Sequence, residues 1–157
     1  MKRRRSGYSL IELLVVLAFI GLLARMAVPR YSDMKRRATA AAIIGDVHAI
    51  RLALFTRFAE TQNWPPESGP GVVPPDLVSY MPGQFTFTRP DYEYDYEVWS
   101  LSSGTPGDPQ QDTMIGVAVT VNDMKLVQQL LITASRGYGP FVAGNKVTFF
   151  VTGFSGS

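Results

Sequence analysis

The stretch Ser6-Gly7-Tyr8-Ser9-Leu10-Ile11-Glu12-Leu13 decides how this chain is interpreted. It follows a basic cluster, Lys2 to Arg5, and opens an apolar run that reaches Ala24 with Glu12 as its one charged residue. A carboxylate inside a membrane segment is costly and usually has a function. The run is therefore expected to be a membrane helix in which Glu12 has a specific role.

The apolar run is expected to remain in the mature protein. An ordinary secretory signal is cut at a small-residue site after its apolar stretch, and no such site precedes the next charges here. A plain anchor that is never processed would fit the basic flank, but it leaves Gly7 and Glu12 unexplained.

The basic leader, the junction of Gly7 and Tyr8, and Glu12 together resemble the class III signal of type IV pilins and of type II secretion pseudopilins. The resemblance implies that a prepilin peptidase cuts between Gly7 and Tyr8 and that the new terminus at Tyr8 is N-methylated, although Phe is more usual there. It also implies that Glu12 directs filament assembly by pairing with the free amine of an adjacent copy. A buried cation is most cheaply placed beside a carboxylate. A pair within one helix is also open, because Tyr8 and Glu12 are four positions apart.

One long helix is expected from residue 8 to about residue 60. At about 1.5 Å per residue it would be roughly 80 Å long, so only its N-terminal half fits a hydrocarbon core of about 30 Å. The other half should dock into a head through an apolar stripe, with Arg57 among the polar residues of the opposite side. The stripe consists of Ile43, Val47, Ile50, Leu54 and Phe58.

Gly21 and Pro29 predict a kink or break near residues 25 to 29, because proline removes a hydrogen bond and clashes with the preceding turn. Both match helix-breaking positions of pilins, in which the stretch between them can become extended in a filament. Arg25 lies within this stretch. It either snorkels to the membrane surface or pairs with an acid of a neighbouring copy.

The remaining chain is expected to form a connector over residues 61–83 and a head over 84–157, after a leader of residues 1–7. The prolines of the connector exclude a regular helix or a central strand. It either covers the apolar stripe or offers a proline motif to a partner. In the head, alternation of residue types predicts strands at 84–89, 92–100, 115–121 and 146–151, and a helix over 123–135 capped by Asn122.

These elements predict an α+β fold of pilin-like type, in which a long N-terminal helix packs on a small antiparallel β-sheet. Charge is divided along it: residues 25–57 contain seven basic residues and two acidic ones, whereas the chain from Glu60 onward has four and ten. An acidic head could therefore fit the basic stem of a neighbour, or both could simply be solvated.

The sequence contains little that indicates an enzyme active site or a metal site. The chain has no cysteine, which excludes a disulfide, a thiolate site and a thiol nucleophile. His48 has no nucleophile within one turn and is expected to pack beside the apolar stripe. The row of Asp91, Glu93, Asp95 and Glu97 offers oxygen ligands to a cation such as calcium, but a strand face that stays in water and discourages edge pairing explains it better. We expect no enzyme activity, no cofactor and no metal.

The sequence thus predicts a structural subunit of a type IV pilus-like or type II secretion pseudopilus filament. Its expected partners are prepilin peptidase, copies of itself or related pilins, an inner-membrane assembly platform and membrane lipid, and its acidic head argues against nucleic acid. Likeness to the family, rather than the distribution of Lys and Arg, places it as a single-pass protein of the inner (cytoplasmic) membrane with an extracytoplasmic head, later incorporated into a periplasmic or surface filament. The alternative is a single-pass anchored binding domain that never assembles.

Overall fold

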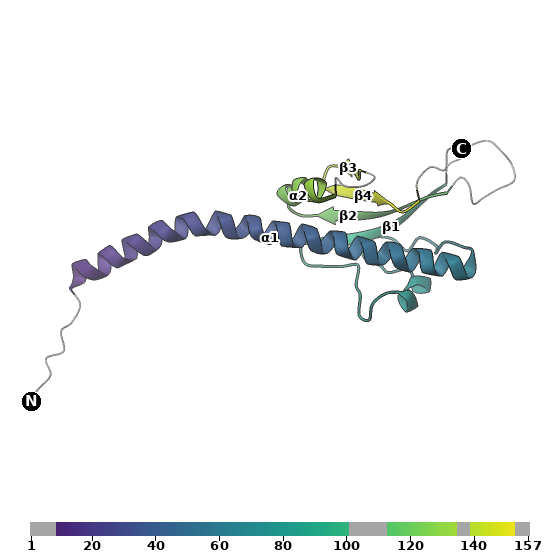
Figure 1. Ribbon diagram of the computed structural model, residues 1–157, viewed down its shortest axis with the longest axis horizontal. Coiled ribbons are helices and arrows are strands. Elements are labelled where there is room, and N and C mark those ends of the chain that lie inside the picture. Colours follow the sequence, from purple (N-terminus) through teal and green to yellow (C-terminus); the bar gives the residue numbers. More distant parts are fainter. Residues whose placement is uncertain (1–8, 101–112, 135–138, 153–157) are drawn as a thin grey trace, which may run out of the picture. The chain divides into compact units, whose positions relative to one another are not determined.

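The computed structural model describes residues 9–100, 113–134 and 139–152. The chain divides into two compact units, Met1–Arg36 and Arg37–Ser157. Helix α1, Leu10–Thr61, runs through both units (Figure 1).

The first unit is the N-terminal part of α1, and its apolar side chains are not buried. The large hydrophobic residues from Leu10 to Val28 are between 49% and 78% exposed. This helix is long and apolar enough to cross a membrane. A surface of this kind is expected to be covered by lipid or by other helices.

Helix α1 continues through Gly21 and Pro29 without interruption. Proline at position 29 removes one hydrogen bond of the ladder, the one to the carbonyl oxygen of Arg25, and the helix tolerates this loss. The helix is therefore unbroken at these residues, and a kink there, the other form of the expectation, stays a prediction. An extended conformation of this stretch in an assembled filament stays a prediction.

The second unit contains a four-stranded antiparallel sheet with the order β1-β2-β4-β3. Its strands are β1, Tyr92–Ser100, β2, Thr113–Val121, β3, Phe141–Ala143, and β4, Lys146–Phe150. The register places Tyr94 opposite Val119, and Val119 opposite Val147, so aromatic and β-branched residues form rows on one face.

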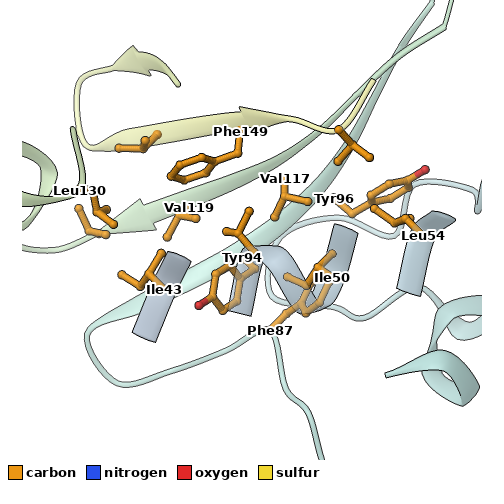
Figure 2. Close-up of a cluster of buried hydrophobic side chains, with 14 of the residues drawn as sticks. Ile43, Ile50, Leu54, Phe87, Tyr94, Tyr96, Val117, Val119, Leu130 and Phe149 are labelled. Carbon is orange, nitrogen blue, oxygen red and sulfur yellow. The ribbon is translucent and has the colours of Figure 1, made fainter. Parts of the chain in front are cut away.

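The core lies between this face of the sheet and the part of α1 that belongs to the second unit. Figure 2 shows Ile43, Ile50 and Leu54 of α1 pointing toward Tyr94 and Val117 of the sheet. All five side chains are fully buried. Each buried side chain of this size contributes roughly 1.5–3 kcal/mol relative to an exposed one, so these contacts fix the helix on the sheet. The predicted α+β arrangement is confirmed.

The opposite face of the sheet is covered locally by side chains. The Trp99 ring lies over Gly116, where an added Cβ would come within 2.9 Å of it. Trp99 also approaches Phe150, with ring centroids 6.2 Å apart. Glycine at position 116 therefore makes room for an aromatic cover.

Residues 84–89 do not form the predicted strand. Gln84 adopts a φ of 62°, and the only bridge of this segment in the described residues joins Thr88 to Glu93. The segment is instead held against β1 by single hydrogen bonds, including one from the Tyr94 amide to the Phe87 carbonyl at 2.8 Å. This arrangement buries Phe87 completely.

Three further elements differ from the sequence prediction. A 3-10 helix, η1, Pro75–Tyr80, interrupts the connector, because a proline is tolerated in the first turn of a helix. The helix α2, Met124–Ala134, is capped by Asp123 rather than Asn122, since Asp123 Oδ1 accepts a hydrogen bond from the Lys125 amide at 2.9 Å. Strand β3 has three residues, too few for a recognisable alternation.

Candidate functional site

The candidate functional site is the exposed apolar segment of α1 together with its two charged residues. Glu12 lies in the first turn of the helix, where a carboxylate is favoured by the helix dipole. Arg25 lies further along, and both residues are exposed. Gly7 and Tyr8, the predicted cleavage and methylation residues, lie outside the described residues.

Gly21 and Pro29 both lie inside α1 and are exposed. A Cβ added at Gly21 would meet no atom within 4 Å. The described part of the chain therefore gives no packing reason for a glycine at this position. Their predicted role in assembly stays a prediction.

Polar contacts attach the C-terminal half of α1 to the head. The Tyr94 hydroxyl donates to Asp46 Oδ2 at 2.8 Å, and Arg89 approaches the same oxygen at 3.7 Å. Burial, followed by the hydrogen bond to Asp46, raises the pKa of Tyr94 far above its ordinary value. Tyr94 therefore remains a neutral donor, and it links α1 to β1 inside the core.

Arg57 is buried, which corrects the prediction that it lies on the polar side of the helix. Its guanidinium donates to Asp76 Oδ2 at 2.6 Å and also to the carbonyl oxygen of Asn63. Both acceptors lie after α1 in the chain. The long side chain thus connects the end of the helix to η1, and no pattern within the helix alone could have indicated this.

Aromatic packing also connects the C-terminal end of α1 to the segment that follows it. Trp64 stacks on Phe58 with ring centroids 4.3 Å apart and meets Phe55 edge-on at 5.9 Å. The Tyr96 hydroxyl donates to the carbonyl oxygen of Pro65 at 3.2 Å. The start of the connector therefore packs on the C-terminal end of α1 and on β1, as predicted for a covering segment.

The acidic row of β1 does not stay entirely in water. Asp95 is only 5% exposed. Lys146 of β4 donates to Asp95 Oδ2 at 3.3 Å and also to Glu97. Burial raises the pKa of Asp95, and the hydrogen bond to Glu97 raises the pKa of Lys146. The predicted solvated face is therefore wrong at Asp95, where a lysine two strands away covers the acid.

Two other polar predictions can be compared with the structure. His48 is exposed, so it is not the packing residue that the sequence predicted. In the part of the chain that the structure describes, no three His, Asp or Glu side chains are grouped so as to hold a metal ion.

Comparison with known proteins gives relatives that include type IV fimbrial proteins. A type IV major fimbrial protein, FimA, of Dichelobacter nodosus is 26% identical over 154 residues, which cover 92% of this chain and 89% of the relative. Another FimA of that organism is 29% identical over 155 residues, which cover 98% of this chain and 79% of the relative. A fimbrial protein of Pseudomonas aeruginosa is 37% identical over 58 residues, which cover 37% of this chain and 38% of the relative.

No protein-family model matches the chain. No solved structure matches it either.

Proposed function

We propose that this chain, whose homologues are type IV fimbrial proteins, is a structural subunit of a type IV pilus-like filament. The observation that carries the proposal is an exposed apolar helix in a chain homologous to those proteins over nearly its whole length. A surface of this kind is stable only in lipid or against other helices. A filament of identical copies supplies such helices. The pseudopilus of type II secretion is a second filament of the same architecture.

Before assembly, the subunit is held in the inner membrane by α1, with its head on the extracytoplasmic side. A prepilin peptidase removes residues 1–7 by cutting between Gly7 and Tyr8, and the new amine of Tyr8 is methylated. The motif around the junction supports this step. An assembly platform in the inner membrane then moves the processed subunit from lipid into the filament.

Glu12 is the assembly residue in this proposal. Cleavage creates a cationic amine at Tyr8, which must be neutralised when the helices leave lipid for an apolar bundle. The carboxylate of Glu12 on an adjacent copy neutralises it. Pairing between copies sets their relative position in a way that apolar packing alone does not.

The test is to co-express the full chain with a prepilin peptidase and its assembly platform. The intact mass and first residue of the membrane-extracted product would be determined, and sheared filaments would be quantified. The expected product begins at Tyr8, with or without one methyl group, and enters filaments. An intact Met1 terminus in the presence of active peptidase would contradict the proposal.

The matched variant is Glu12→Ala. It should be cleaved like the wild type and yet fail to enter filaments, because the buried amine then lacks a partner. Equal incorporation of Glu12→Ala would remove the role given to Glu12. A cleaved wild-type chain that never enters filaments would favour the alternative, a single-pass anchored binding domain.

A further inference from the structure

Glu12 and Arg25 are the two charged residues of α1 between Leu10 and Pro29. Both are exposed, and every other residue of this stretch is apolar or glycine. Arg25 cannot be neutralised within its own helix, because side-chain pairs form three or four positions apart. The residues at those positions are Gly21, Leu22, Val28 and Pro29.

The helix places the two charges far apart and on different sides. They are thirteen residues apart. In an α-helix this spacing corresponds to about 20 Å along the axis and about 140° around it. No contact between the two side chains is possible within one copy. A neighbouring parallel helix that is shifted along the axis can bring them together.

Lipid headgroups can contact the Arg25 guanidinium only while the chain is in the membrane. Arg25 precedes Arg30 by five residues, or about 7.5 Å along the helix, which is within reach of an arginine that snorkels to the headgroups. A bundle of helices in a filament offers no headgroup. A guanidinium brought there requires an anion, and Glu12 is the single acid of the apolar stretch.

We propose that Arg25 of one copy pairs with Glu12 of a second copy that is shifted by about 20 Å along the helix axis. This inference rests on the proposed filament function. The two charges lie on different sides of the helix, so the contact is head-to-tail rather than self-complementary. Repetition of such a contact gives an open helical filament. If the stretch from Gly21 becomes extended on assembly, each extended residue rises about 3.3 Å instead of about 1.5 Å. The axial shift between the two copies then grows by that difference for each extended residue, and Arg25 still pairs with Glu12.

Glu12 can accept hydrogen bonds from both partners assigned to it, and the three groups together carry one net positive charge. Glu12 has two oxygens with about four acceptor sites, enough for the Tyr8 amine of one neighbour and the Arg25 guanidinium of another. The pairing therefore adds a contact to the proposed role of Glu12. It also gives Arg25 a function that packing within a single copy does not.

The first test compares filament yields of Arg25→Glu, Arg25→Lys and the control Arg30→Glu in the full chain with its peptidase and platform. Arg25→Glu brings two carboxylates together, so filament yield should fall at least about tenfold, while cleavage is unchanged. Arg25→Lys keeps the charge and should stay within about threefold of wild type. Arg30→Glu makes the same charge change outside the pair and should also stay within about threefold. Equal yields of Arg25→Glu and Arg30→Glu would overturn the inference.

The second test identifies the partner directly. A photo-crosslinking benzoylphenylalanine replaces Leu22, one turn from Arg25, so that both charges remain, and cross-linked peptides from purified filaments are mapped by mass spectrometry. The expected cross-links join this position to residues 9–16 of another copy. Cross-links to lipid alone, or only to other parts of the chain, would refute the pairing.

The two levels of the proposal fail in different ways. A wild-type chain that forms no filaments contradicts the proposed function, and the inference falls with it. Wild-type filaments that tolerate Arg25→Glu and give no cross-link to residues 9–16 contradict the pairing alone.

Discussion

At the scale of single residues, Arg57 shows how a charged side chain can become part of the core. Its side chain is 10% exposed, while that of its partner Asp76 is 49% exposed. The ion pair is therefore buried at one end and open to water at the other. Loss of the acid would leave a buried guanidinium with the carbonyl oxygen of Asn63 as its remaining described acceptor.

We expect Asp76→Ala to lower the free energy of unfolding by roughly 1–2 kcal/mol, because a buried charged donor loses its acceptor while the exposed side of the pair is screened by water. The measurement is thermal or urea unfolding of the full chain in detergent. Asp33→Ala is the matched control, since the Asp33 carboxylate is 67% exposed where it pairs with Arg36. The control should cost less than about 0.5 kcal/mol. If both variants lost the same free energy of unfolding, burial of Arg57 would not strengthen its ion pair with Asp76.

At the scale of elements, side-chain ion pairs connect β1 to β4 across the intervening strand β2. Lys146 lies two strands from Asp95 and Glu97 and donates hydrogen bonds to both. Asp95 Oδ1 is buried and has no hydrogen-bond partner in the described structure. The pKa of Asp95 is therefore raised by burial despite its lysine.

The sign of the pH dependence follows from this shift. Where the folded pKa of an acid lies above its unfolded pKa, the folded protein binds more protons, so stability rises as the pH falls toward the ordinary Asp pKa. For Lys146, whose folded pKa is also raised, the contribution is fully present below the ordinary Lys pKa and is lost as the pH rises through the folded value.

Lys146→Met should lower stability at pH 7 by roughly 1–3 kcal/mol, because it leaves the buried Asp95 carboxylate without its cation. The loss should shrink at pH 5, as Asp95 becomes protonated more readily. Asp95→Asn is the companion variant and should be close to neutral at pH 7, since it removes an incompletely paired buried charge. Thermal unfolding at both pH values would measure these changes. A loss for Lys146→Met that grows as the pH falls would contradict the assignment.

At the scale of the whole molecule, the two units have different requirements for stability. The second unit contains the buried core, whereas the large hydrophobic residues of the first unit are exposed. Removal of the apolar segment should therefore remove the need for detergent without removing the fold.

A chain that begins at Arg30 is expected to be soluble and monomeric, with a melting temperature within a few degrees of that of the full chain in detergent. The reason is that residues 1–29 contribute no side chain to the buried core of the described structure. Light scattering after gel filtration and circular dichroism would measure both properties. A truncated chain that is unfolded would show that the first unit stabilises the head.

The sequence by itself determined the long helix, the strand at residues 92–100 and the resemblance to type IV pilins. Periodicity and an uninterrupted apolar run depend on local spacing, which the chain order contains directly. The short segment Gly7, Tyr8 and Glu12 was sufficient for the resemblance because its chemistry is concentrated in neighbouring residues.

Only the tertiary structure decided which polar residues are buried and what neutralises them. Arg57 meets Asp76, and Lys146 meets Asp95, over 19 and 51 positions of the chain. Residues 84–89 looked like a strand by alternation, but positive φ at Gln84 and single hydrogen bonds to β1 give them another conformation. Contacts between distant positions depend on the relative placement of helix, connector and sheet, and this placement is set by packing of the whole core rather than by any local pattern.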